Sequence, residues 1–231
     1  MTEKSCVFDE TGIFIKESKN RFLCEVKVNE RITECYIPSS CRIDNFLELS
    51  NKEVLLSKNK SKNPRTQYRV VAVKHKRSYI ILNTSISNLL IYNNLHLRRF
   101  SFLGSRKNAL KEKMIGSYKA DILIQSKGCD TIIEIKSIIS PNHEAFFPTV
   151  YSQRAIDQLQ QIKSLLAAGY NACYIFVSLN PYTKNLQINP AIKEYHALLN
   201  DCVQLGMVLK GYSCKCLNNK LSLTKEITVC L

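Results

Sequence analysis

The chain has 231 residues, of which 45% are hydrophobic and 23% are charged, with only seven Gly and six Pro. This composition is typical of a globular protein and excludes a collagen-like, low-complexity or wholly disordered chain. The length suits one large domain or two small ones. The net charge of +14 favours polyanionic partners.

The positive charge is concentrated in one stretch. No acidic residue lies between Glu53 and Glu112, whereas thirteen Lys and Arg do, and five Tyr and Phe are interleaved with them. Cations hold phosphates while aromatic rings stack on bases, so the pattern favours nucleic-acid binding. The alternative is a solvated basic face that binds nothing specific. An anionic membrane would be attracted by the same charge, but no amphipathic basic helix presents it, and we expect no membrane binding.

Cysteine use indicates a reducing compartment. The ten cysteines are scattered without a C-x-x-C, and the closest pair, Cys214 and Cys216, lacks the spacing of a zinc site, so we predict free thiols. The initial segment MTEKSCVFDE has no apolar core of a secretory signal. We therefore expect a cytoplasmic protein.

The first half of the chain is predicted to consist of short strands. Apolar and polar residues alternate over 22–29 and 32–39, and further strand patterns cover 53–59, 68–75 and 79–85. Five closely spaced strands predict a small all-β barrel over residues 1–85. An oligonucleotide-binding (OB) barrel is the leading five-stranded candidate, and an SH3-like barrel or an open meander remains an alternative.

Residues 86–231 mix helix and strand patterns. Helices are predicted at 87–97, 108–114, 152–168 and from about Pro190, and strands at 119–125, 131–139, 172–178 and 207–216. Gly169 is placed as the stop signal of the long helix. This alternation predicts an α/β domain with a mixed central sheet.

Three charged residues fall on two predicted neighbouring strands. Asp121 lies on the first, and Glu134 and Lys136 share one face of the second, because alternate strand residues point the same way. If the two strands pair, the carboxylates meet inside an apolar sheet. Such a group requires a balancing charge, which Mg²⁺ or Mn²⁺ supplies with oxygen ligands. Glu112, on the helix predicted just before, is a further candidate ligand.

This arrangement fits phosphodiester hydrolysis. A bound divalent ion polarises a phosphoryl oxygen and lowers the pKa of a coordinated water, which Lys136 would orient. The alternative is an ordinary salt bridge on an edge strand. The E-x-K pattern also occurs at Glu17 and Glu25, so the motif alone does not decide between the two.

Nearly the whole chain resembles the sugar fermentation stimulation protein (SfsA) family of bacteria. The matching segments, in order and with compatible spacing, are NRFLCEV (20–26), YIPSS (36–40), NPRTQYRVVAV (63–73), LNTSISNLL (82–90), KEKMIGSYKADILI (111–124), TIIEIKSI (131–138), FFPTVYSQRA (146–155) and AAGYNACYIFV (167–177).

The resemblance implies an N-terminal OB-like barrel and a C-terminal domain similar to the restriction-endonuclease-like, PD-(D/E)XK nucleases. Members are described as DNA-binding proteins connected with sugar (maltose) metabolism. The nuclease core falls on Glu112, Asp121, Glu134 and Lys136. In the long helix, Gln153 and Gln158 stand where at least some relatives have Glu and His. This helix therefore lacks the acid and the proton carrier that those relatives have at these positions.

Together these patterns predict a DNA-binding protein with a Mg²⁺- or Mn²⁺-dependent phosphodiesterase site at Asp121, Glu134, Lys136 and Glu112. RNA is an alternative substrate, and a homodimer is left open. The residues expected to contact nucleic acid are Arg21, Lys58, Lys60, Lys62, Arg65, Arg69, Lys74, Lys76, Arg77, Arg106, Lys107, Lys119 and Arg154.

Two other functions compete with this one. The first is a DNA-associated regulator that retains a nuclease-like fold without turnover. The second is a metabolic enzyme acting on a small phosphorylated sugar, which the absence of a Gly-rich phosphate loop from the sequence disfavours.

Overall fold

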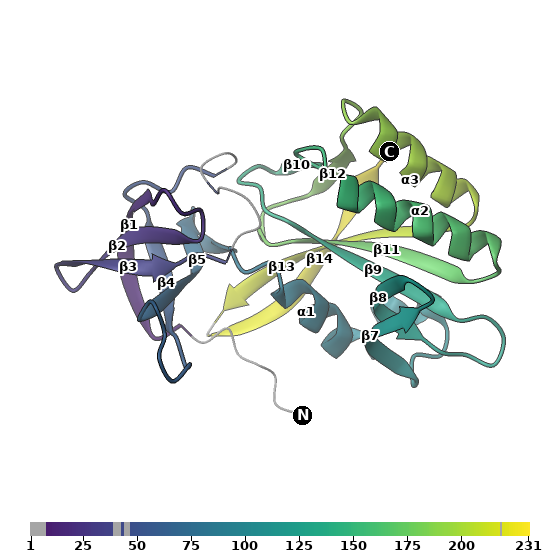
Figure 1. The fold of residues 1–231 in the computed structure, drawn as a ribbon, viewed down its shortest axis with the longest axis horizontal. Coiled ribbons are helices and arrows are strands. Elements are labelled where there is room, and N and C mark those ends of the chain that lie inside the picture. Colours follow the sequence, from purple (N-terminus) through teal and green to yellow (C-terminus); the bar gives the residue numbers. More distant parts are fainter. Residues whose placement is uncertain (1–7, 39–42, 44–46, 218) are drawn as a thin grey trace.

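The computed structural model describes residues 8–38, 43, 47–217 and 219–231. Figure 1 shows a small β-structure built from the N-terminal part of the chain beside a larger part in which helices cover both faces of a sheet. This arrangement confirms the predicted division into an all-β unit and an α/β unit.

The N-terminal unit is a closed barrel with one additional strand. Its strands run in the order β3-β2-β1-β4-β5, and a parallel pairing of β3 with β5 closes the circle, while β6 pairs with the far end of β5. Apolar side chains fill the interior, among them Phe14, Val26 and Leu56. The strands are β1 (Glu10–Glu17), β2 (Leu23–Val28), β3 (Arg31–Tyr36), β4 (Glu53–Lys58), β5 (Tyr68–His75) and β6 (Ser78–Ile81).

Five strands close the barrel, as predicted, but they are not the same five. The sequence patterns missed β1, and the strand predicted at 79–85 corresponds to β6, which extends the sheet instead of closing it. β1 begins with Glu10, and Gly12 follows two residues later, and both residue types are depleted in strands. Gly12 is required there, because a Cβ at this position would lie 2.5 Å from Cγ1 of Val26 on β2.

The C-terminal unit is a mixed sheet in the order β10-β12-β14-β13-β11-β9-β8-β7. Its strands are β7 (Ala109–Ile115), β8 (Tyr118–Ile124), β9 (Thr131–Ile138), β10 (Glu144–Phe147), β11 (Asn171–Ser178), β12 (Asn185–Ile188), β13 (Val208–Leu217) and β14 (Lys220–Cys230). β11 lies parallel to β9 and β13, whereas β8 is antiparallel to β9.

Helices cover the two faces of this sheet (Figure 1). On one face lie α2 (Gln153–Ala167) and α3 (Lys193–Gln204), and on the other lie α1 (Ile86–Asn94) and a 3-10 helix (Arg98–Leu103). The core beneath α1 also contains Leu55, Val71 and Ala72 of the barrel. One apolar cluster therefore joins the two units.

One predicted helix is wrong. Within 108–114, residues 109–114 belong to strand β7, which pairs with β8 through the two-residue turn Gly116-Ser117. Leu110 and Met114 are four residues apart and imitate a helical stripe, but both side chains are exposed. The sequence signal for a hairpin here is Gly116, because Gly readily adopts the positive φ that a tight turn requires. In the structure its φ is +58°.

Two further features of the described residues concern membrane-spanning helices and cysteines. No helix in the described parts of the chain is long and apolar enough to cross a membrane. The eight cysteines that the structure describes are all free thiols, as predicted.

Candidate functional site: a fork in the sheet beside a basic surface

Strands β8 and β9 separate at the point where the predicted carboxylates lie. Their last paired residues are Ile122 and Ile133. Immediately beyond them the backbone N–H of Ile135 donates a 2.8 Å hydrogen bond to Oδ2 of Asp121. A side chain thus replaces the neighbouring strand as hydrogen-bond partner. Beside this fork lies a cavity of about 510 Å³, lined by Asp121, Glu134 and Lys136 among others.

Glu134 and Lys136 form a buried ion pair at the fork. The side chain of Glu134 is 3% exposed, and Nζ of Lys136 lies 2.7 Å from its Oε1. The hydroxyl of Tyr118 donates to Oε2 of Glu134, and Nζ of Lys136 also donates to Oε1 of Gln158, at 2.7 Å. The pair is thus a salt bridge, as the alternative supposed, but it is buried rather than facing solvent.

Asp121 is held from the opposite side of the sheet. Nδ2 of Asn88, on α1, donates a 2.6 Å hydrogen bond to its Oδ1. Burial, and then the charge of Glu134, raise the pKa of Asp121 to about 6, against the opposing effects of the Ile135 N–H, Lys136 and Asn88. The fork therefore holds two mutually repelling carboxylates and one ammonium group.

Glu112 is placed differently from the other predicted ligands. It lies on strand β7 rather than on a helix, is exposed, and forms an ion pair with Lys119, which lowers the pKa of its carboxyl. Glu112 and Asp121 both line a neighbouring cavity of about 280 Å³. Among the residues described by the structure, no group of three or more His, Cys, Asp or Glu is arranged to hold a metal ion.

Three residues at the fork were not predicted as site residues. Tyr118 fixes one oxygen of Glu134, Asn88 fixes one oxygen of Asp121, and Gln158 orients Lys136. Gln158 was noted only as a departure from relatives. No local pattern points to the other two, because they reach the site from different elements.

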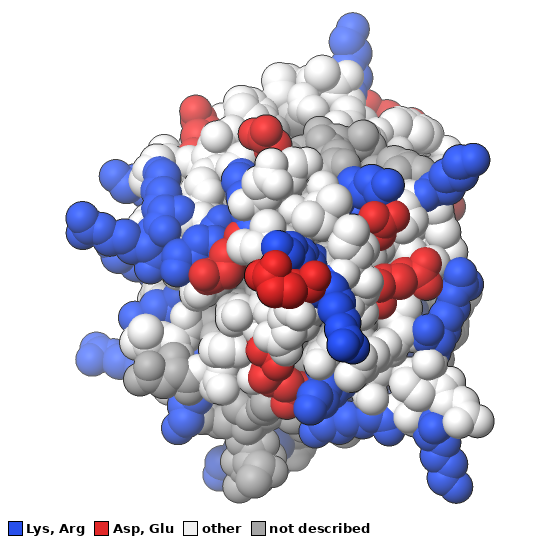
Figure 2. Space-filling model, turned by 90° about the vertical axis from the view of Figure 1, so that its left-hand side faces the viewer, with Lys and Arg blue, Asp and Glu red and all other residues white. Residues whose placement is uncertain are grey.

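The barrel carries most of the predicted phosphate-binding cations. Five exposed side chains follow the β4–β5 hairpin, at positions Lys58, Lys60, Lys62, Arg65 and Arg69. Arg21 is also exposed and lies over the ring of Phe22. Figure 2 views this end of the molecule and shows Lys and Arg around its margin, with Asp and Glu nearer its centre. The surface is therefore not uniformly basic.

Several other predicted cations already have partners within the protein. Lys74 pairs with Glu53 at 3.6 Å, while Lys76 lies 3.1 Å from Nε2 of His143, between the two units. Arg77 is exposed in the turn after β5.

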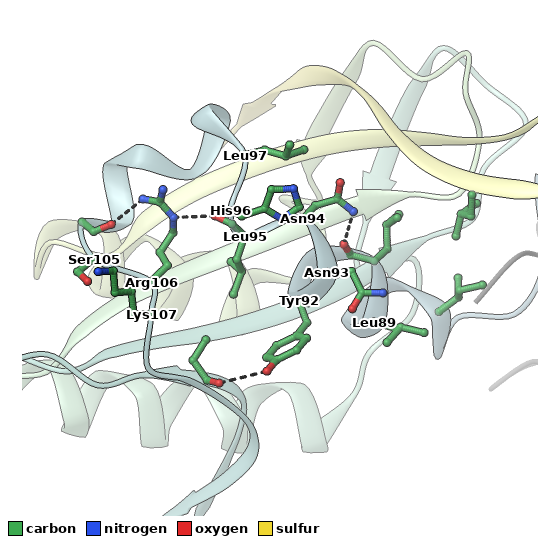
Figure 3. A pocket seen from close by; sticks show the side chains of 15 residues that line it. Leu89, Tyr92, Asn93, Asn94, Leu95, His96, Leu97, Ser105, Arg106 and Lys107 are labelled. Atoms are coloured by element: carbon green, nitrogen blue, oxygen red, sulfur yellow. Dashed lines mark hydrogen bonds between the residues drawn. The ribbon is translucent and has the colours of Figure 1, made fainter. Parts of the chain in front are cut away.

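Arg106 has a structural role at the end of α1. Its guanidinium donates to the carbonyl oxygens of Leu95, Phe100 and Gly104, and the first and last of these bonds are drawn in Figure 3. Arg106 and Lys107 line a cavity of about 970 Å³ beneath α1. By contrast, Lys119 and Arg154 line the small cavity beside Asp121.

Fold and site together define a class of protein: a closed β-barrel joined to a mixed α/β domain, with two carboxylates and a lysine at a fork in its sheet. Two family models match this chain. The SfsA N-terminal OB domain covers residues 17–82, and the sugar fermentation stimulation protein RE domain covers residues 85–220. The chain therefore belongs to the sugar fermentation stimulation protein (SfsA) family.

Individual relatives are distant but match over nearly their whole length. Sugar fermentation stimulation protein homologs from Desulforamulus reducens and Clostridium botulinum are 24% and 23% identical, over 94% of this chain and 91% and 94% of their own. A solved structure, described as that of Pyrococcus furiosus SfsA in complex with Ca²⁺, matches with a TM-score of 0.81 at 17% identity, covering 98% of this chain and 99% of that one. This likeness confirms the two-domain fold.

Proposed function

We propose that this protein binds nucleic acid and hydrolyses phosphodiester bonds at the fork with the help of Mg²⁺ or Mn²⁺. The observation that carries the proposal is the convergence of Asp121, Glu134 and Lys136 at one solvent-accessible cavity. The Ca²⁺ in the described complex of the Pyrococcus furiosus relative supports a divalent cation.

The side chains at the fork fit a hard divalent cation. Asp121 and Glu134 supply only oxygen donors, and Mg²⁺ is commonly held by one or two carboxylates together with water and substrate phosphate. A third carboxylate is therefore not required, and Glu112 can remain paired with Lys119. A cation held there would offset the repulsion from Glu134, which adds to the effect of burial in raising the pKa of Asp121. It would also stabilise charge on the reacting phosphoryl group and activate the attacking water.

The remaining groups orient the reactants. Hydrogen bonds to Glu134 and Gln158 fix the position of the Lys136 ammonium. It can therefore donate to the attacking water or to a phosphate oxygen with little further loss of conformational freedom. Arg154 lies in the first turn of α2, and this turn contains no acidic residue. A cation at this positive helix end is unfavourable unless an anion joins it, which favours a phosphate beside Arg154.

Cleavage assays test the proposal directly. Single- and double-stranded DNA and RNA are incubated with the protein and Mg²⁺ or Mn²⁺, and with the variants Asp121→Ala and Lys136→Ala. We expect each variant to cleave about a hundredfold to a thousandfold more slowly, because charge stabilisation at the reacting phosphate is lost. Asp201→Ala is the matched control, since that carboxylate pairs with Lys163 on the outer helices. Undiminished cleavage by both site variants would contradict the assignment.

A non-catalytic DNA-binding regulator is the second candidate, and one observation favours it. Each carboxylate oxygen at the fork already accepts a hydrogen bond from the protein, Asp121 from Asn88 and Ile135, and Glu134 from Tyr118 and Lys136. A ligand that binds only the folded state raises its stability by mass action. Equal melting temperatures with and without Mn²⁺, together with salt-sensitive DNA binding, would favour the regulator.

A further inference from the structure

The cavity at the fork has an exposed apolar wall that phosphate chemistry does not require. The wall is formed by Phe146, on β10, and by Val150 and Tyr151, in the segment that leads from β10 to α2. These side chains are 50%, 62% and 56% exposed, and they line the same cavity as Asp121 and Glu134. Exposed apolar side chains gathered beside polar groups mark a binding surface more often than chance exposure does.

The strand direction at Phe146 and the hydrogen bonds of the Tyr151 hydroxyl set how this wall is presented. Phe147 points into the core, where its ring lies 5.5 Å from that of Phe176, so its strand neighbour Phe146 faces outward. The hydroxyl of Tyr151 donates to Oε1 of Gln153 at 2.6 Å and lies 3.3 Å from Oε2 of Glu194. The hydroxyl is tethered while much of the side chain stays exposed, which leaves little conformational freedom to lose on binding.

We propose that Phe146 and Tyr151 form a stacking site for an unpaired nucleobase. This inference rests on the proposed function and specifies its substrate class: a single-stranded nucleic acid, or one with an unpaired nucleotide beside the scissile phosphate. Bases stack on protein aromatic rings without regard to sequence, whereas a duplex keeps its base faces stacked within the helix. Arg154 lines the same cavity and supplies the positive charge for the adjoining phosphate.

Binding measurements without metal test the stacking site separately from catalysis. Fluorescence anisotropy compares a short labelled single-stranded oligonucleotide with the blunt duplex of the same sequence, in the presence of a chelator. We expect Tyr151→Ala to weaken single-strand binding about fivefold to a hundredfold and duplex binding less than about twofold, and Phe146→Ala to act in the same direction. Tyr151→Phe keeps the ring and should retain most of the affinity.

Leu205→Ala is the control, because Leu205 is an apolar side chain that is 48% exposed but lies outside both this cavity and the basic stretch. It should change neither affinity. A second measurement places a single abasic nucleotide at each position of the oligonucleotide in turn. At one position the abasic nucleotide should weaken binding to the unsubstituted protein. At the same position it should not weaken binding to Tyr151→Ala any further, because that variant has already lost the ring.

The outcomes separate this inference from the proposed function. If Tyr151→Ala and Phe146→Ala leave single-strand binding unchanged, or weaken single-strand and duplex binding equally, the stacking site is refuted, even where Asp121-dependent cleavage of duplex is observed. If single-strand binding depends on Tyr151 but no metal-dependent cleavage occurs, the stacking site stands and the hydrolase proposal fails. If no nucleic acid binds, both fail.

Discussion

The barrel surface and the fork between β8 and β9 each contain a Lys–Glu pair, and the two pairs differ in almost every respect. Lys74 and Glu53 on the barrel lie 3.6 Å apart with side chains 43% and 41% exposed. Lys136 and Glu134 at the fork lie 2.7 Å apart with side chains 16% and 3% exposed. Water can replace either partner on the barrel, whereas at the fork only other protein groups can.

The difference shows how the chain uses its charge. Most of the net charge of +14 sits on exposed side chains whose positions need only be approximate. At the fork the polar groups are hydrogen-bonded to one another. Tyr118 and Lys136 both donate to Glu134, and Asn88 donates to Asp121. Under the proposed function, the barrel would hold the nucleic acid by exposed charges, whereas the fork would position a few atoms closely.

Removing the ammonium at the fork should have the largest effect on stability. We expect Lys136→Met to lower the free energy of unfolding by about 3–5 kcal/mol, because it leaves the buried carboxylate of Glu134 without its counter-charge. Urea denaturation measures this change. The double variant Lys136→Met, Glu134→Gln should recover most of the loss. A single-variant loss below about 1 kcal/mol would show that the two regions do not differ in this way.

The raised pKa of Asp121 should make the stability of the protein depend on pH. Its pKa is raised from 3.8 to about 6 in the folded state, so its contribution to stability is fully present below about pH 3.8 and is lost as the pH rises through about 6. In metal-free protein, we expect the unfolding free energy of wild type relative to Asp121→Asn to fall by roughly 2 kcal/mol between pH 4 and pH 7. Urea denaturation across this range gives the measurement. A difference that stays constant with pH would mean that Asp121 is not buried beside a second negative charge.

The surface pair on the barrel should have the smallest effect. Lys74→Ala removes an ion pair that is open to solvent, and we expect the unfolding free energy to change by less than about 1 kcal/mol at any salt concentration. Urea denaturation at low and high salt provides the test. A loss as large as that of Lys136→Met would remove the contrast between the barrel and the fork.

Much of the fold follows from local patterns in the sequence. Strand alternation over 131–139 correctly places Glu134 and Lys136 on one face, and the long helix ends before Gly169, whose φ is +94°. Strand periodicity and helix termination depend on residues close together in the chain, so a pattern can reveal them. A helix and a strand can share the same local pattern, as at 108–114, and the pattern alone then does not identify which of the two forms.

Only the tertiary structure decides where β8 and β9 separate and what surrounds the gap. Asn88 arrives from α1 on one face of the sheet and Gln158 from α2 on the other, while Phe146 lies on β10 and Tyr151 in the segment between β10 and α2. These groups meet because both faces of the sheet are packed against helices that lie far away in sequence. The residue types of the site were therefore readable from the chain, but their partners and the apolar wall were set by long-range packing.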